Sequence, residues 1–147
     1  MLSFRKFPTG YLTVALESDE ILTRIDVPKI VPGSGSTFLE FSRRPADFAI
    51  VSVAVQLSVD AGGRLTRATI AVGGIDYSPM RLVEAENAIT GHYPTRDLFQ
   101  TASEMTASLD CEGDELYPAE YRRDLCGVLV ERALAQAAER AGTQANV

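Results

Sequence analysis

The clearest hydrophobic pattern in the chain is an alternation of apolar and polar residues over 53–59. Apolar side chains occupy every second position there, and small or polar side chains lie between them. A period of two places the two sets on opposite faces of a strand, so one face is expected to be buried. Residues 60–63 (Asp-Ala-Gly-Gly) suit a tight reversal into a second strand over 65–72. These two strands are predicted to form the centre of the core.

Shorter apolar runs predict further strands before this centre. They cover residues 12–16, the alternating stretch 21–27, which Pro28 ends, and residues 37–42. The stretch 29–35 is rich in Pro, Gly and Ser and is predicted to be a loop.

The second half of the chain has helical spacing. Ser78-Pro79 predicts the start of a first helix that runs through Ile89 and ends at Gly91. A second helix is predicted from Thr95, with apolar residues four, three and four positions apart up to Leu109. A third is predicted from Pro118 and fades after Gly142. Its apolar stripe is expected to contain Tyr121, Leu125, Val128, Leu129 and Ala133.

This order of elements, strands first and helices afterwards, predicts an α+β fold. We expect a small antiparallel sheet of three to four strands covered on one face by three helices. The chain has 147 residues, of which 46% are hydrophobic, which suits one compact core.

Charge and composition exclude several classes of protein. The net charge of -6 argues against nucleic acid as a partner. No run approaches the ~20 apolar residues that span a bilayer, and no signal peptide core follows Met1. Cys111 and Cys126 have no CxxC spacing, so we expect reduced thiols and a cytoplasmic location.

Few residues suggest catalysis or metal binding. His92 is the single histidine, which excludes a histidine-rich metal site, and no nucleophile elbow accompanies it. Gly73-Gly74 lacks the rest of a phosphate-binding motif, so a plain strand-to-helix turn is favoured. The acidic stretch 110–115 lacks the spacing of a calcium loop and is expected to be solvated. We therefore predict no catalytic residue and no metal ligand.

An arginine pair is the most informative polar feature. Arg43 and Arg44, with Asp47, crowd the entrance of the central strand. Two guanidiniums there could bind an anion or a carboxylate partner, and a surface salt bridge is the equally good alternative. The stretch 120–123 (Glu-Tyr-Arg-Arg) has the same ambiguity, with a structural role favoured. Tyr11 follows Gly10 on a turn and could pack in the core or at its rim.

Four segments together resemble one protein family. They are residues 7–22, which include Phe-Pro-Thr-Gly-Tyr-Leu-Thr-Val, residues 41–51 (Phe-Ser-Arg-Arg-Pro-Ala-Asp-Phe-Ala-Ile-Val), residues 71–81 with their Gly-Gly pair, and residues 120–125. In this order they resemble the FAD-binding medium subunit of molybdenum hydroxylases, of the carbon monoxide dehydrogenase and xanthine dehydrogenase type. The resemblance extends from residue 7 to the mid-130s.

The resemblance implies a fold, a cofactor and partners. In that family FAD receives electrons from a [2Fe–2S] cluster and passes them to an acceptor, and the molybdenum subunit chooses the substrate. The C-terminal domain, a small sheet covered by three helices, closes over the flavin ring. By resemblance, Tyr11, Arg43, Arg44 and Asp47 are expected to face FAD, and the partners are a flavin-binding domain and the molybdenum and iron–sulfur subunits.

The resemblance also divides the chain. Residues 1–30 correspond to a linker and first strands as found after a flavin-binding domain, residues 31–141 to the C-terminal α+β body, and residues 142–147 to a frayed tail. The family holds the FAD pyrophosphate on glycine-rich loops of a larger N-terminal domain, which these residues lack. Because backbone donors of such loops supply much of the anion affinity, we expect weak or no FAD binding by this chain alone.

Two hypotheses of function follow. In the first, the chain is the lid and assembly domain of a flavin-dependent oxidoreductase and is not catalytic alone. In the second, it is a stand-alone interaction module that forms a homodimer through the surface left by the missing domain, because exposed apolar surface of that kind is normally covered.

Overall fold

The computed structural model of the chain describes residues 2–10 and 12–144. They divide into two compact units, one up to Ile30 and one from Val31 onward. The first unit contains a short 3-10 helix, η1 (Phe4–Lys6), and a two-stranded antiparallel sheet of β1 (Pro8–Gly10) and β2 (Thr13–Val14).

The strand predicted over 21–27 is wrong. No strand occurs between β2 and Ser34, and the strand predicted over 12–16 is reduced to Thr13–Val14. Ile21, Ile25 and Val27, which would have formed the buried face, are 82%, 68% and 80% exposed. An alternating sequence forms a strand only where a neighbouring strand pairs with it, and none does so here.

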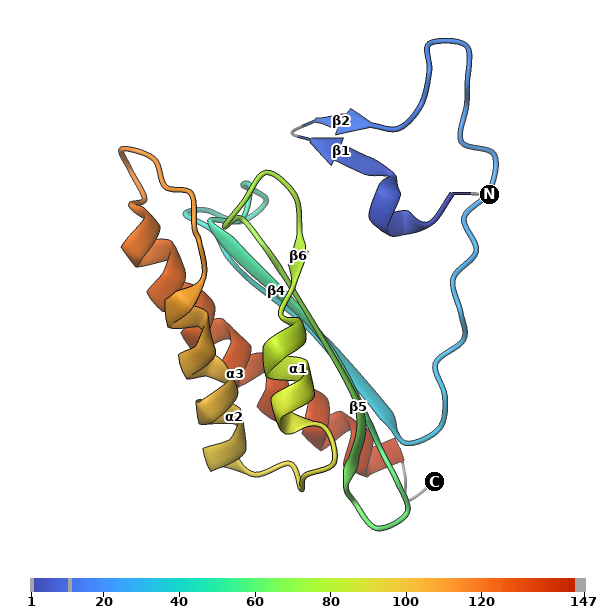
Figure 1. Cartoon of the computed structure of the whole chain (residues 1–147), viewed down its shortest axis with the longest axis vertical. Helices are drawn as coiled ribbons and strands as arrows, with labels where there is room; N and C mark the ends of the chain where they lie inside the picture. Colours follow the sequence, from blue (N-terminus) through green and yellow to red (C-terminus); the bar gives the residue numbers. More distant parts are fainter. Residues whose placement is uncertain (1, 11, 145–147) are drawn as a thin grey trace. The chain divides into compact units, whose positions relative to one another are not determined.

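The second unit is built on a four-stranded antiparallel sheet. Its strands are β3 (Ser34–Phe41), β4 (Val51–Val59), β5 (Leu65–Gly73) and β6 (Met80–Arg81), in the order β3-β4-β5-β6. The long strands β4 and β5 lie side by side in its middle (Figure 1). The predicted α+β fold, with a small antiparallel sheet and three helices, is confirmed.

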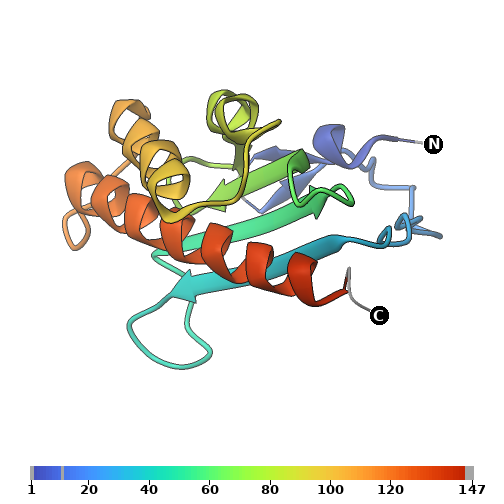
Figure 2. The ribbon, with the colours of Figure 1, turned by 90° about the horizontal axis from the view of Figure 1, so that it is seen from below.

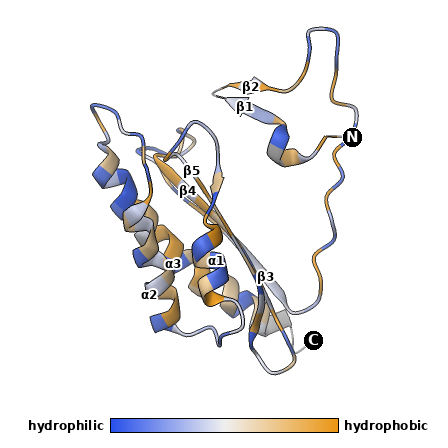
Figure 3. Ribbon diagram, in the orientation of Figure 1, coloured by the Kyte–Doolittle hydropathy of each residue, from blue (hydrophilic) through white to orange (hydrophobic). Residues whose placement is uncertain are grey.

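The alternation over 53–59 produces the buried face of this sheet. Val53, Val55 and Leu57 are at most 2% exposed. They are the centres of three paired rows across β3, β4 and β5: Leu39–Val53–Val72, Thr37–Val55–Ile70 and Gly35–Leu57–Ala68. The hydrophobic colour on β4 and β5 in Figure 3 follows from this pattern. The predicted centre of the core is therefore confirmed.

Three helices cover that face. They are α1 (Val83–Ile89), α2 (Arg96–Glu104), which continues into the 3-10 helix η2 (Met105–Ser108), and α3 (Ala119–Gln144). Figure 2 shows all three on one side of the sheet. At the start of α2, the Thr95 hydroxyl accepts a hydrogen bond from the Leu98 N–H at 3.3 Å, which confirms the predicted helix start. No helix in the described part of the chain is long and apolar enough to cross a membrane.

The first helix starts later than predicted. Met80–Arg81, placed by the sequence inside a helix from Ser78-Pro79, instead forms β6 and pairs with β5. The Leu82 N–H donates to the Ile70 carbonyl at 3.0 Å, so α1 begins only at Val83. Pairing of Met80–Arg81 with the otherwise free edge of β5 therefore outweighs the local preference of this segment for a helix.

Helix α3 begins directly after Pro118, as predicted, but its buried stripe differs from the predicted one. Tyr121 and Val128 are 42% and 45% exposed, whereas Leu129 and Ala133 are buried. The remaining buried side chains of this helix are Cys126, Val130, Leu134, Ala137 and Ala141. Several are small, so the helix lies close to the sheet: a Cβ added at Gly35 would lie 2.0 Å from the Ala137 carbonyl oxygen.

Candidate functional site

The loop of residues 42–50, here called the rim loop, joins β3 to β4 and carries three of the predicted site residues. Two guanidiniums approach one carboxylate: Arg43 Nη2 lies 3.9 Å and Arg44 Nε 3.7 Å from Asp47 Oδ2. The two arginine side chains are 59% and 71% exposed. Exposed pairs of this kind contribute at most about 1 kcal/mol to stability, so they add little to the fold itself.

Short-range contacts shape the rim loop. The Ser42 hydroxyl and the Asp47 N–H both donate to the Arg44 carbonyl, at 2.9 and 3.1 Å. Ala46 adopts a left-handed backbone with φ of 65°, which is uncommon for a residue other than glycine. The turn leaves Phe48 88% exposed. Strained backbone of this kind is found preferentially at functional sites.

Residues 110–118, here called the acidic segment, lie on the other side of the site. Asp114 Oδ1 accepts hydrogen bonds from the N–H groups of Leu116 and Tyr117, both at 2.8 Å. The Glu112 N–H donates to the Ile75 carbonyl at 2.8 Å and ties the segment to the chain after β5. The acidic side chains are exposed, as predicted, but Asp114 in addition orders the turn.

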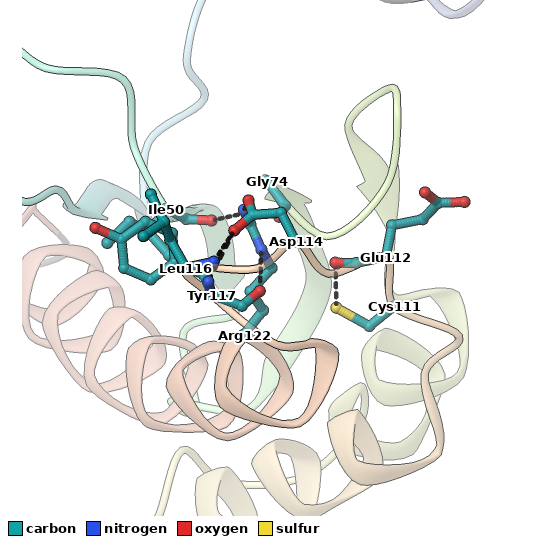
Figure 4. Close-up of polar contacts among 8 residues, drawn as sticks. All are labelled: Ile50, Gly74, Cys111, Glu112, Asp114, Leu116, Tyr117 and Arg122. Carbon is teal, nitrogen blue, oxygen red and sulfur yellow. Dashed lines mark hydrogen bonds and ion pairs between the residues drawn. The ribbon is translucent and has the colours of Figure 1, made fainter.

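Arg122, in the first turns of α3, joins these parts (Figure 4). Its Nη1 donates to the carbonyls of Ile50 and Gly74, at 2.8 and 2.7 Å. Its Nη2 pairs with Asp114 Oδ2 at 2.5 Å, and its Nε donates to the Tyr117 carbonyl at 3.2 Å. The structural role favoured for the 120–123 stretch agrees with these contacts.

The acid of this pair is ionised at neutral pH. The hydrogen bond from the Tyr117 backbone N–H is the main cause that lowers the pKa of Asp114, and bonds from Arg122 and the Leu116 N–H lower it further. Partial desolvation opposes them. The Arg122–Asp114 contact is therefore a charge-assisted hydrogen bond.

A glycine, Gly74, allows the chain after β5 to lie close to the Ile50 carbonyl. Gly74 has a φ of +85°, and a Cβ added to it would lie 2.4 Å from the Ile50 carbonyl oxygen, which is an Arg122 acceptor. Gly73 thus ends β5 and Gly74 begins a turn, as the sequence favoured, but the predicted connection from strand to helix is wrong. The turn leads to strand β6 rather than directly to a helix.

A hollow of about 240 Å³ lies between the rim loop and the acidic segment. Its lining residues are Arg43, Asp47, Phe48, Ala49, Ile50, Asp114, Leu116, Tyr117 and Arg122. The structure thus brings Arg43 and Asp47 together with Arg122, whereas Arg44 does not line the hollow. Tyr11 lies outside the described residues. The sequence does not predict three residues of this site: Asp114, Leu116 and Tyr117. The nearest sequence signals are the acidic stretch 110–115 and the 120–123 motif.

The remaining candidates are two cysteines and one histidine. Cys111 and Cys126 are free and buried, and burial raises the pKa of the Cys126 thiol to about 12 and also that of Cys111. Both are therefore neutral thiols rather than nucleophilic thiolates. His92 is exposed in a loop. In the part of the chain that the structure describes, no cluster of three His, Cys, Asp or Glu side chains could hold a metal ion.

The sequence and the structure match known proteins. The family model for the CO dehydrogenase flavoprotein C-terminal domain matches residues 36–137. The chain is 34% identical over 143 residues to the 6-hydroxypseudooxynicotine dehydrogenase complex subunit alpha of Paenarthrobacter nicotinovorans, covering 93% of this chain and 48% of that subunit. It is 36% identical over 135 residues to the nicotine 6-hydroxylase medium subunit of the same organism, covering 91% and 46%.

A solved structure shares the fold. It is the carbon monoxide dehydrogenase from Hydrogenophaga pseudoflava, in a form that lacks the Mo-pyranopterin moiety of the molybdenum cofactor. The match has a TM-score of 0.83 and 28% identity, and covers 92% of this chain and 47% of that chain. The chain spans about half the length of the curated relatives it matches.

Proposed function

This chain belongs to the CO dehydrogenase flavoprotein C-terminal domain family, and we propose that it forms one wall of the FAD site in an oxidoreductase of the molybdenum hydroxylase type. The observation that carries the proposal is the family match over residues 36–137, which includes the rim loop, the acidic segment and Arg122. In such an enzyme FAD takes electrons from an iron–sulfur cluster and passes them to an acceptor. In this proposal, residues of the rim loop contact the cofactor, the other residues of the site orient that loop, and none of them reacts.

The site fits part of FAD and not all of it. The hollow of about 240 Å³ is smaller than the ~300–1,000 Å³ typical of pockets that enclose a ligand. The sequence has no glycine-rich phosphate-binding motif, the usual source of backbone donors for a pyrophosphate. These residues can therefore cover one side of a flavin, while a partner flavin-binding domain holds the pyrophosphate.

The rim loop supplies the contacts in this proposal. Arg43 and Arg44 are held beside Asp47 yet remain exposed, so their N–H groups can donate to oxygen atoms of the cofactor. Phe48 and Leu116, 88% and 74% exposed, offer apolar surface to the partner domain. Tyr11 is proposed as a further flavin contact on the resemblance of the 7–22 segment.

A homodimer is the second candidate. Within the unit from Val31 onward, the three helices occupy one face of the sheet, and Phe38 is 60% exposed. A second copy could cover the other face and leave no role for FAD. Analytical ultracentrifugation of the chain and FAD titration of the chimaera described next distinguish the two candidates. A stable dimer of the chain, together with a chimaera that takes up no FAD, supports the homodimer.

The proposal is tested with a chimaeric subunit, in which this chain replaces the matching half of the nicotine 6-hydroxylase medium subunit. FAD is added to the chain alone and to the chimaera, and binding is followed by flavin fluorescence and visible absorption. We expect no saturable binding to the chain alone and a yellow chimaera with stoichiometric FAD. Stoichiometric FAD on the chain alone, or a folded chimaera without flavin, would contradict the proposal.

A further inference from the structure

Arg122 contacts oxygen atoms from three segments that are far apart in the sequence. The Ile50 carbonyl ends the rim loop, the Gly74 carbonyl follows β5, and the Tyr117 carbonyl and Asp114 carboxylate belong to the acidic segment. Two of these segments form opposite walls of the hollow. One guanidinium therefore fixes the distance between those walls.

Few other polar contacts hold the rim loop to its surroundings. Its remaining bonds are internal, between Ser42, Arg44, Asp47 and Phe48, apart from the Ile50 N–H, which donates to the Phe41 carbonyl at the base of the loop. Among the hydrogen bonds and ion pairs of the described residues, the bond from Arg122 to Ile50 alone joins this loop to α3.

Arginine is suited to this position and lysine is not. A guanidinium presents five donors in a planar fork, whereas an ammonium presents three donors from one atom. The Arg122 side chain is only 14% exposed, so its bonds are little weakened by water. Asp114 balances its charge and is itself held by the N–H groups of Leu116 and Tyr117.

We propose that Arg122, held by Asp114, is the positioning residue that sets where the rim loop presents Arg43 and Asp47 to the flavin. This inference rests on the proposed function for the identity of the ligand. Arg122 acts through the loop rather than by touching the cofactor. It is thus distinct from the residues predicted to face FAD.

Hydrogen exchange of the 147-residue chain tests the positioning itself. The amides of Asp47 and Ile50 report on the loop because both are hydrogen-bonded within it or at its base. In Arg122→Lys we expect them to exchange about tenfold faster, as for the loss of a hydrogen bond to a charged group. Arg123→Lys is the matched control, because Arg123 donates through Nε to the Leu109 carbonyl, away from the loop. If Arg122→Lys does not fold, Asp114→Asn takes its place.

FAD affinity of the chimaera tests the link to the cofactor. We expect the dissociation constant for FAD to rise about tenfold in Arg122→Lys and to stay unchanged in Arg123→Lys, both measured at a temperature at which the two variants are folded. Unchanged exchange at Asp47 and Ile50 would overturn the positioning role. Faster exchange with unchanged FAD affinity would overturn the link to flavin. An unmodified chimaera without FAD would instead overturn the proposed function.

Discussion

At the scale of single residues, the arginine pair of the rim loop carries the proposed contact with FAD. In the chimaera, replacing Arg43 and Arg44 together by alanine is expected to weaken FAD binding at least about tenfold, because charge-assisted hydrogen bonds contribute roughly 1.5–3 kcal/mol each. Fluorescence titration measures the effect. The charge-matched control replaces Arg96 and Arg132, which are exposed and lie away from the rim loop on α2 and α3. A lowered melting temperature with unchanged FAD affinity would mean that Arg43 and Arg44 are structural.

Asp114 makes the stability of the site depend on pH. Its pKa is lowered on folding from an ordinary value of 3.8, so its contribution is complete above that value and is lost as pH falls toward the lowered pKa. Denaturant midpoints of the unmodified chain and of Asp114→Asn are therefore expected to differ by a constant amount near neutral pH. Below pH 3.8 the difference should shrink. A difference that does not change over this acid range would show that Asp114 is not held as an ionised partner of Arg122.

Gly74 gives a test of backbone crowding at the same site. Gly74→Ala and Gly63→Ala both force alanine into a left-handed backbone, with φ of +85° and +81°, at a cost of about 1–2 kcal/mol. Only the first also places a Cβ 2.4 Å from the Ile50 carbonyl oxygen. We expect Gly74→Ala to be more destabilising by roughly 2 kcal/mol or more in urea denaturation. Equal effects would mean that the approach of Gly74 to Ile50 is loose.

The sequence predicts part of this site for a physical reason. Arg43 and Asp47 are four positions apart on one turn, so their contact follows from local geometry. Asp114 and Tyr117 reach the same hollow only because β4, β5 and α3 fold together, and no local pattern encodes that proximity. Tertiary contacts of this kind require the register of the whole sheet.

At the scale of elements, one partly buried ion pair attaches α1 to the sheet. Glu86, 6% exposed, accepts from the Ile70 N–H at 2.8 Å and pairs with Arg81 through two hydrogen bonds. The hydrogen bond that Arg81 donates to the Glu86 carboxylate raises the pKa of Arg81, so its guanidinium is charged. Glu86→Gln is expected to destabilise the chain by about 3 kcal/mol, because it leaves Arg81 without its counter-charge. Glu84→Gln, exposed on the same helix, should change stability by less than about 0.5 kcal/mol. Equal unfolding free energies for the two variants would contradict this role.

A comparison of the elements shows where a hydrophobic pattern in the sequence is enough to predict a strand or a buried helix face. The alternation over 53–59 predicts β4 correctly because the helices bury one of its faces. The similar alternation over 21–27 has no such partner and forms no strand. Helix α3 has apolar residues on several sides, so the stripe that meets the sheet is decided by close packing at Gly35. Burial, and not periodicity alone, selects among such patterns.

At the scale of the whole molecule, the observed fold is the one that the matched family has. The two units contribute different parts of the proposed function. The unit from Val31 onward contains the sheet, the three helices and the hollow. The unit up to Ile30 contains the segment that resembles the connection to a flavin-binding domain. In the proposed function, the site is therefore one wall of the flavin site, and a second domain holds the rest of the cofactor.

The most direct test is a crystal structure of the chimaera with FAD bound. We expect the flavin to lie against the rim loop, with Arg43 or Arg44 donating to a cofactor oxygen and Arg122 still bonded to Ile50 and Asp114. A structure in which bound FAD touches no residue of the rim loop would contradict the proposed wall of the flavin site.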